Sequence, residues 1–521
     1  MMVRLTSLAA LAAASFLPTA LSAATPRAEA RRAVEGEWSE VIKLPVISIA
    51  AYVVPRFPES NRVLLFSAYR NDTFGGASGK TQFADLNFET GVVSHREVAD
   101  TNHDMFCPGI SQLADGRINI QGGSNAEVTT LYDPATNTFT RGSDLAEPRG
   151  YQTSTILSNG KVFTIGGAFS GELKGKNGEI YDPSTDTWTG LPGADVTPIL
   201  TDDPEGVFRA DNHAWLVGWK NGSVFQAGPS KDQHWYYTTG NGSLELAGTR
   251  DTDHSMCGVW ALYDAVKGKI FSAGGSPFYT NSDATNRAHI TTIGEAGEPS
   301  TVQRVADMAF PRGFADANIL PDGTILVTGG QRRSRIFTDI DATLIPDLYD
   351  PETDTWTQLA PESVPRTYHS VSILLADGRV FSGGGGACDV KPGDSDAHCD
   401  RTIDHSDGQI FSPPYLFNAN GTEAARPVIS DLAQEPVKAG ASLSFTISEP
   451  LKSLSLIRLG SVTHSVNSDQ RRIPLAFDIV EGAVATQLPS DYGILVPGFY
   501  YLFAVSEQGV PSIGKSVHVI L

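Results

Sequence analysis

The sequence predicts an all-β protein in which a ring of seven β-sheets is followed by a smaller β-sandwich. Glycine (51 residues) and proline (31 residues) are abundant, and only 19% of the 521 residues are charged, as is typical of turn-rich β proteins. A short β motif recurs along most of the chain, and the pattern changes after about residue 427. The length exceeds what one hydrophobic core needs, so we expect at least two domains.

The recurring motif is a glycine turn, a short β run and a pair of glycines or similar residues. Its copies follow one another at intervals of about 50 residues, which is the period of kelch repeats. They occupy residues 61–68, 116–123, 160–167, 222–229, 268–275, 323–330 and 378–385. Seven four-stranded blades close into a propeller that protects most sheet edges. The first copy has few residues before it, so we expect strands from both ends of the repeat region to close the ring.

The remaining sequence predicts a second domain. Alternating apolar and polar runs at 441–448 and 499–505 favour a small immunoglobulin-like antiparallel sandwich. We therefore assign residues 33–426 to the propeller and residues 427–521 to the sandwich.

The N-terminus has the features of a secretory signal. Arg4 precedes an apolar run at 5–21 and small residues at 22–24, which offer a cleavage site. The Arg31-Arg32 pair indicates a short pro-segment, so that residues 1–32 would be removed; the alternative is an ordinary exposed charge pair. No later stretch is long and apolar enough to span a bilayer. We expect a secreted, extracellular protein.

In a secreted protein, glycosylation sequons are candidate modification sites. Four sequons begin at Asn71, Asn221, Asn241 and Asn420, and we expect a glycoprotein.

The net charge of −20 and the pI near 4.9 oppose binding to nucleic acid or to anionic membranes.

The four cysteines divide into two kinds. Cys388 and Cys399 flank a polar loop and are expected to form a disulfide. A zinc site with His398 and its neighbours has irregular spacing and is not favoured. Cys107 and Cys257 have no evident partner, which calls for an explanation in an oxidising compartment. Cys257 is interpreted as a buried structural thiol.

The register of the repeats brings candidate reactive residues together. Cys107, Tyr151 and Tyr368 each lie nine or ten residues before the first glycine of a motif, near the start of an innermost strand. Inner strands line the propeller axis, so these side chains and the imidazole of His369 can meet at one axial mouth. Imidazole and phenolate suit copper(II). Copper changes by one electron, so a two-electron oxidation at this site would need a second redox group, and a Cys107–Tyr151 thioether would supply it.

Several motifs in the same order resemble the galactose oxidase family of copper-radical oxidases. The likeness extends from about Trp38 to the C-terminus and omits that family's N-terminal carbohydrate-binding domain. The matching segments are 103–109 (HDMFCPG), 149–152 (RGYQ), 211–215 (DNHAW), 330–333 (GQRR), 366–370 (RTYHS), 460–467 (GSVTHSVN) and 469–474 (DQRRIP).

The resemblance implies a role for each residue of the site. Tyr151, joined to Cys107 by self-processing, would be an equatorial ligand of one copper ion and the radical site. His369 and His464 would be the nitrogen ligands, with His464 carried by a hairpin of the C-terminal domain. Tyr368 would be the axial ligand and the general base for the substrate hydroxyl. The expected partners are a small primary alcohol and O2, with an activating peroxidase as a further candidate, and we expect a monomer.

The sequence departs from the family's galactose-oxidising members around the substrate. Phe169 stands where they have a tryptophan over the thioether. Arg209 and Tyr279 are retained, but Glu205, Phe208 and Thr280 replace polar groups usual in those members. An aromatic rim of Phe74, Phe106 and Phe337 is preserved.

Fewer polar groups weaken discrimination for a sugar. The sequence therefore predicts an oxidase of aliphatic or aryl primary alcohols that forms aldehydes and H2O2. The alternatives are a galactose oxidase acting on the C6 hydroxyl, or a secreted kelch binding protein without catalysis. The other histidines, including His213, His254 and His289, are interpreted as structural or exposed.

Overall fold

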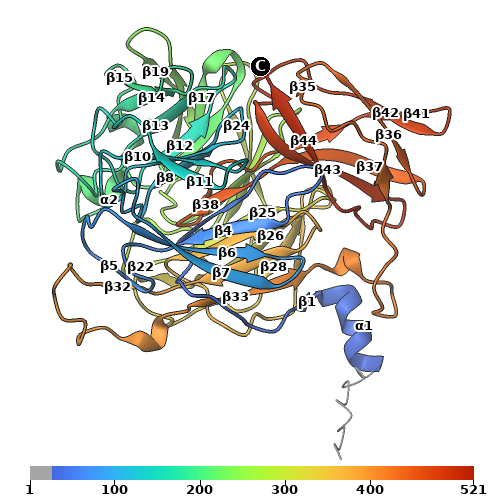
Figure 1. Ribbon diagram of the computed structural model, residues 1–521, viewed down its shortest axis with the longest axis horizontal. Coiled ribbons are helices and arrows are strands. Elements are labelled where there is room, and N and C mark those ends of the chain that lie inside the picture. Colours follow the sequence, from blue (N-terminus) through green and yellow to red (C-terminus); the bar gives the residue numbers. More distant parts are fainter. Residues whose placement is uncertain (1–25) are drawn as a thin grey trace, which may run out of the picture.

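The structure is a computed structural model that describes residues 26–521, and it consists almost wholly of short β-strands (Figure 1). The predicted signal segment and the start of the pro-segment, residues 1–25, lie outside the described residues. Helix α1 (Pro26–Glu35) contains the Arg31-Arg32 pair. None of the helices between residues 26 and 521 is both long and apolar enough to cross a bilayer.

Seven sheets form the propeller, as predicted. Blade 1 contains β3 (Ala50–Val53), β4 (Arg62–Phe66), β6 (Thr81–Asn87) and β7 (Val92–Val98), and blade 2 contains β8 (Gly109–Gln112), β9 (Ile118–Gln121), β10 (Thr129–Asp133) and β11 (Thr138–Arg141). Blade 3 contains β12 (Thr153–Ile156), β13 (Val162–Ile165), β14 (Gly178–Asp182) and β15 (Thr187–Leu191). Blade 4 contains β16 (Trp215–Gly218), β17 (Val224–Gly228), β18 (Asp232–Tyr237) and β19 (Ser243–Thr249). Blade 5 contains β20 (Val259–Asp264), β21 (Lys269–Ala273), β23 (Ala288–Thr292) and β24 (Thr301–Val305). Blade 6 contains β25 (Gly313–Ile319), β26 (Ile325–Gln331), β28 (Asp347–Asp350) and β29 (Thr355–Gln358), and blade 7 contains β30 (Ser370–Leu374), β31 (Val380–Gly384) and β33 (Asp407–Ser412).

The N-terminal strands close the ring, which confirms that both ends of the repeat region contribute to it. Strands β1 (Glu37–Trp38) and β2 (Ile42–Lys43) pair with β33 and complete blade 7. The next segment of chain supplies β3 of blade 1. Strands from the beginning and the end of the propeller therefore share one sheet, which fastens the circle with backbone hydrogen bonds.

The glycine pairs of the repeat are required by close packing between neighbouring blades. Both glycines of the pairs at 122–123 and 329–330 have positive φ, which other residues adopt only at a cost. A Cβ on Gly122 would lie 2.5 Å from the Arg149 carbonyl oxygen, and one on Gly329 would lie 2.5 Å from that of Arg366. The repeated glycines thus let each blade approach the start of the next innermost strand.

Buried arginines complete these contacts. The Arg149 guanidinium donates to the Gly166 carbonyl at 2.8 Å and pairs with Glu179. Arg366 likewise donates to the Gly384 carbonyl, 2.8 Å away. Each arginine lies within three residues of a predicted metal ligand, so these bonds within blades 3 and 7 also fix the backbone of the site.

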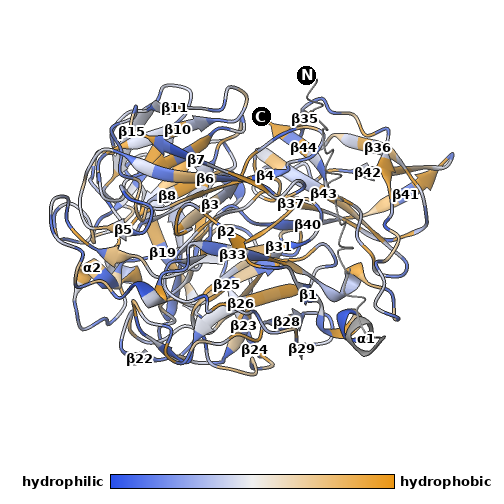
Figure 2. Ribbon diagram, turned by 60° about the horizontal axis from the view of Figure 1, so that its bottom comes forward, coloured by the Kyte–Doolittle hydropathy of each residue, from blue (hydrophilic) through white to orange (hydrophobic). Residues whose placement is uncertain are grey.

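The second domain is a sandwich of two sheets. One sheet contains β34 (Ile429–Ser430), β36 (Ser442–Ile447), β42 (Ala483–Gln487) and β41 (Phe477–Val480); the other contains β35 (Val437–Lys438), β44 (Lys515–Ile520), β43 (Gly498–Ser506), β37 (Leu451–Arg458) and β40 (Arg472–Leu475). Hydrophobic residues follow the strands of both domains (Figure 2). One continuous core joins Trp219, Trp235 and Trp260 of the propeller to Leu456 and Tyr500 of the sandwich.

Short elements connect these sheets. They are α2 (Val207–Ala210), the 3-10 helices η1 (Thr197–Ile199), η2 (Lys220–Gly222), η3 (Arg401–Ile403) and η4 (Pro414–Leu416), a pair of strands β22 (Ser282–Asp283) and β27 (Arg333–Ser334), and a parallel pair β5 (Thr73–Phe74) and β32 (Cys388–Asp389). The Cys388–Cys399 disulfide is formed, as predicted, and these two sulfurs are therefore not available for a zinc site.

Candidate metal centre and active site

A ring of residues with positive φ surrounds one end of the propeller axis. Each member lies at or just before the innermost strand of its blade, and the φ angles range from 54° to 70° in Cys107, Tyr151, His213, Cys257, Phe314 and His369. Their backbones are linked between blades: the Tyr151 amide donates to the Cys107 carbonyl (2.9 Å) and the His213 amide to the Tyr151 carbonyl (3.0 Å). Such conformations cost about 1 kcal/mol or more each and concentrate at functional sites.

The structure corrects the expected register at the third position. His369, rather than Tyr368, occupies the place equivalent to Cys107 and Tyr151, because it has the positive φ and immediately precedes its inner strand. Tyr368 is still in the site. Its ring stacks on His369 with centroids 3.9 Å apart, and its hydroxyl lies 2.8 Å from the Tyr151 hydroxyl.

His464 reaches this mouth from the second domain. Strands β38 (Ser461–Thr463) and β39 (Val466–Asn467) form a hairpin, and β38 pairs with β3, so the hairpin extends blade 1 at the propeller axis. His464 is at the hairpin turn, with φ of 49°. Its Nε2 lies 3.2 Å from the Cys107 Sγ, although the two residues are 357 positions apart.

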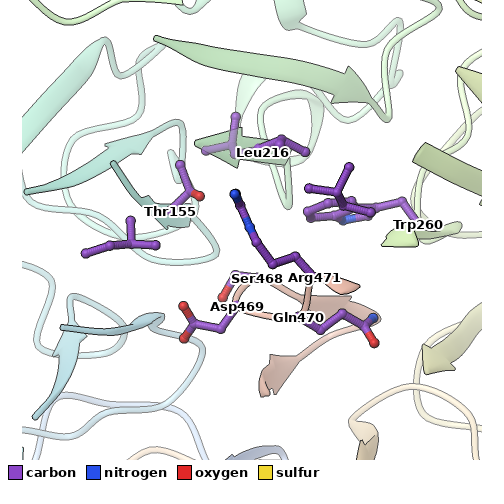
Figure 3. A pocket seen from close by; sticks show the side chains of 10 residues that line it. Thr155, Leu216, Trp260, Ser468, Asp469, Gln470 and Arg471 are labelled. Carbon is purple, nitrogen blue, oxygen red and sulfur yellow. The ribbon is translucent and has the colours of Figure 1, made fainter. Parts of the chain in front are cut away.

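Polar residues after the hairpin fasten it to different blades. Asp469 accepts from the Gln112 amide at 2.7 Å, and Gln470 donates to the Ala317 carbonyl at 2.8 Å. Arg471 donates to the Gly218 carbonyl at 2.7 Å; Figure 3 shows its side chain extending between Thr155, Leu216 and Trp260. These bonds to blades 2, 6 and 4 set the position of His464.

The hydrogen bonds at Nδ1 of the two imidazoles leave both Nε2 atoms unprotonated, with a lone pair that can bind a metal. His369 Nδ1 lies 2.6 Å from the Gly386 carbonyl. A carbonyl only accepts, so Nδ1 bears the proton and Nε2 presents its lone pair; this Nε2 is buried and has no hydrogen-bond partner among the described residues. The Thr463 hydroxyl donates to the Ile49 carbonyl and therefore accepts from His464 Nδ1 at 2.6 Å. Both rings are thus oriented as metal-binding histidines usually are.

The donor set fits copper(II). The ligand atoms of Cys107, His369 and His464 all lie within 4.8 Å of one another, and the hydroxyls of Tyr151 and Tyr368 meet at the same place. Two imidazole nitrogens and two phenol oxygens are a nitrogen and oxygen set that suits this ion.

Burial keeps the isolated groups neutral. It lowers the pKa of His369 to about 3 and the pKa of His464 well below its usual value. It also raises the pKa of Tyr151 and of Tyr368 well above the usual value of a phenol. A phenolate at this site therefore needs a cation to compensate its charge.

The Cys107 thiol is free and buried beside Tyr151. Desolvation raises its pKa well above the usual value, and a hydrogen bond with the Tyr151 side chain opposes part of that shift. The geometry places the thiol next to the phenol with which a thioether would form.

A cavity of about 240 Å³ opens beside Tyr151. Phe74 and Phe106 stack in its wall with centroids 4.2 Å apart and nearly parallel rings. Phe169 covers Tyr151 at 4.4 Å and is 38% exposed. The remaining lining consists of Gly75, Gly76, Ala77, Ser124, Ser170, Asp389 and Lys391. The wall beside the reactive phenol is therefore mainly aromatic.

Three other predicted contacts lie near the site without lining this cavity. The Arg209 guanidinium lies over the Tyr279 ring at 4.6 Å, and Phe337 packs edge-on against Tyr368 at 5.2 Å. Glu205, four residues before Arg209, lies 3.6 Å from its Nε. A carboxylate at this position competes with substrate hydroxyls for the guanidinium.

Sequence reasoning missed three members of the ring. His213, taken as structural or exposed, stacks on His464 at 4.9 Å with an interplanar angle of 17°. Phe314 packs on Tyr368 at 5.0 Å, and Cys257 belongs to the same buried cluster. The signal for His213 and Phe314 is in the sequence, because each lies nine residues before the first glycine of its own repeat.

Comparisons with known proteins agree with this arrangement. Residues 197–391 match the family described as the glyoxal oxidase N-terminus, and residues 426–519 match the galactose oxidase-like early set domain. A galactose oxidase from Gibberella zeae is 47% identical over 93% of this chain and 70% of its own length. The aldehyde oxidase GLOX of Vitis pseudoreticulata is 28% identical over 72% of this chain and 73% of its own.

A solved structure gives the same result in three dimensions. The structure of a fungal alcohol oxidase of the AA5 family in complex with copper superposes with a TM-score of 0.88 and 44% identity, covering 93% of this chain and all of that one. Because a relative with such identity is matched over more than two thirds of its length, this chain belongs to the galactose oxidase-like family.

Proposed function

We propose that this protein is a secreted copper-radical oxidase that converts aryl and apolar aliphatic primary alcohols to aldehydes. The overall reaction is RCH2OH + O2 → RCHO + H2O2. The observation that carries the proposal is the convergence of two phenols, two imidazoles with unprotonated Nε2 atoms and one buried thiol at the propeller mouth. The matched relatives include a galactose oxidase and a copper-containing alcohol oxidase.

Tyr151, Tyr368, His369 and His464 would hold the copper ion. The ion would supply a one-electron acceptor, which complements the single electron that an oxidised phenol can accept. We propose that Cys107 and Tyr151 form a thioether, with the two lost hydrogens reducing one O2 to H2O2; the sulfur then lowers the energy needed to oxidise the phenol.

Tyr368 and Tyr151 would act on different hydrogens of the substrate. Tyr368, ionised when the copper ion compensates its charge, would accept the proton of the substrate hydroxyl. Tyr151, in its radical form, would take a hydrogen atom from the carbinol carbon, and the copper ion would supply the acceptor for the electron that remains, so that the alcohol loses one proton, one hydrogen atom and one electron in total. The short distance between the two hydroxyls, 2.8 Å, brings the O–H and C–H of one substrate within reach of both phenols, which is catalysis by proximity.

The substrate class is inferred from the cavity. Phe74, Phe106 and Phe169 present apolar faces, which suit an aromatic ring or an alkyl chain. Glu205 lies beside Arg209 and weakens its availability to a sugar. A site with few free donors discriminates poorly between polyols. Galactose oxidation is therefore the less favoured alternative.

Secretion is supported by the signal-like N-terminus and by the exposure of all four sequon asparagines, Asn71, Asn221, Asn241 and Asn420.

The test is a panel of alcohols given to purified, copper-loaded protein, with O2 uptake and H2O2 release as readouts. We expect benzyl alcohol and butanol to be oxidised with higher kcat/KM than galactose. Intact mass after aerobic copper loading should fall by two hydrogens beyond the disulfide. A free Cys107 thiol together with no oxidase activity would instead support a non-catalytic binding protein, and a strong preference for galactose would overturn the substrate class.

A further inference from the structure

We propose that the Cys388–Cys399 disulfide loop determines specificity, because it holds Phe74 in the wall of the substrate cavity and thereby selects alcohols by their non-reacting end. This inference rests on the proposed alcohol oxidase function. It concerns a segment that is remote in sequence from every predicted ligand except Tyr368 and His369.

The loop and the Phe74 segment form one small sheet. Strand β32, which begins at Cys388, pairs in parallel with β5, which ends at Phe74. The Cys388 amide donates to the Asp72 carbonyl (3.2 Å) and the Val390 amide to the Phe74 carbonyl (2.6 Å). Figure 1 shows the two strands side by side. Two strands of two residues each have little stability of their own, so their register depends on what fixes the loop.

The other end of the loop holds the same segment. Arg401, two residues after Cys399, donates to the Asp72 carbonyl at 3.0 Å and to the Thr73 hydroxyl at 3.2 Å. The disulfide joins the strand that pairs with Phe74 to the residues beside this arginine. Both ends of the loop therefore contact residues 72–74, and the covalent bond keeps the two contacts together.

Packing leaves the segment little freedom while the loop is closed. A Cβ on Gly75 would lie 2.8 Å from the Val390 backbone, so the two chains are in close contact beyond the ladder. The Tyr69 hydroxyl also donates to the Val390 carbonyl at 2.6 Å. Movement of the loop would thus shift the backbone that carries Phe74.

Phe74 links the position of the disulfide loop to the shape of the substrate cavity. Its ring stacks on Phe106 and meets His369 edge-on at 5.6 Å. Residues 74–77 line the cavity together with Asp389 and Lys391 of the loop itself. The reactive Tyr151 and Tyr368 are instead held at the starts of inner strands. Loosening the loop should therefore change the fit of the substrate's distal part and leave the reacting groups in place.

A double substitution, Cys388→Ser with Cys399→Ser, tests the proposal by a split between KM and kcat. We expect KM for benzyl alcohol to rise about three- to tenfold, the range for losing one aromatic contact. KM for ethanol, which has no aryl group to pack against Phe74 and Phe106, and kcat for both alcohols should stay within about twofold. Asp394→Asn is the matched control, since that side chain lies in the same loop and makes no hydrogen bond within residues 26–521.

Two further measurements keep the test decisive if the double variant folds poorly. Arg401→Gln leaves the disulfide intact and removes the second contact, and it should produce the same split. Hydrogen exchange of metal-free protein should accelerate at residues 72–76 in the double variant and stay unchanged at β12.

The outcomes separate the two proposals. Equal rises in KM for both alcohols, or unchanged exchange at 72–76, would refute the role of the loop while leaving the oxidase in place. A wild-type enzyme that is inactive on benzyl alcohol would refute the proposed function itself.

Discussion

The buried pair of Arg458 and Asp469 should be a main determinant of how firmly the His464 hairpin is seated. Their side chains are 0% and 1% exposed, with Nε and Oδ1 3.3 Å apart. Arg458 also donates to the carbonyls of Gln112 and Pro497, each at 2.7 Å. The substitution Asp469→Asn keeps the shape and leaves the guanidinium without a countercharge in the interior.

The expected loss is large because the pair is buried. Removing one member of a buried ion pair costs about 3–5 kcal/mol in the free energy of unfolding. The surface pair of Arg304 and Asp307, with side chains 52% and 37% exposed, provides the control. There Asp307→Asn should cost less than about 1 kcal/mol.

The assay is urea unfolding of the metal-free proteins, followed by tryptophan fluorescence, and retention of copper during dialysis. We expect Asp469→Asn to unfold at lower urea and to lose copper faster, because the displaced hairpin carries His464. A loss as small as that of Asp307→Asn would show that the pair is not what seats the hairpin, and the reasoning would fail.

Three other outcomes are expected. His464→Ala should lower copper affinity by more than about tenfold, and an unchanged copper content after dialysis, measured by elemental analysis, would contradict its role as a ligand. Glu205→Gln should raise kcat/KM for galactose about two- to fivefold, because it releases Arg209 from a weak ion pair. An unchanged kcat/KM for galactose would contradict that role of Glu205. Burial raises the pKa of Asp104 from 3.8 to about 8, so its contribution to stability is complete below about pH 4 and is lost as the pH rises towards 8. Asp104→Asn should therefore gain stability relative to wild type over that pH window, and a difference in unfolding free energy that does not vary with pH would refute the shift.

Much of the fold is encoded locally. The glycine pairs predict the blades because their positive φ angles and close contacts, such as Gly122 against Arg149, tolerate no side chain. The disulfide was predictable because Cys388 and Cys399 close a short loop. The family motifs then named Cys107, Tyr151, Tyr368, His369 and His464, and the structure brings all five together.

The position of Phe74 shows what local patterns miss. Its aromatic character was evident, but nothing near it in the sequence indicates a partner strand more than 300 residues away. The register at the third position was also misjudged by one residue, because Tyr368, ten residues before Gly378, was grouped with Cys107 and Tyr151, whereas His369 has their offset of nine residues.

By itself the sequence determined the repeat, the glycine turns, the disulfide loop and the chemical types of the ligands, since each depends on residues that are neighbours along the chain. Only the tertiary structure decided that His464 meets Cys107, that His213 stacks behind it, and that the Cys388–Cys399 loop supports Phe74. The reason is that these contacts arise when seven blades close into a circle and a hairpin from the second domain enters its axis. The geometry of that closure depends on the packing of the whole chain.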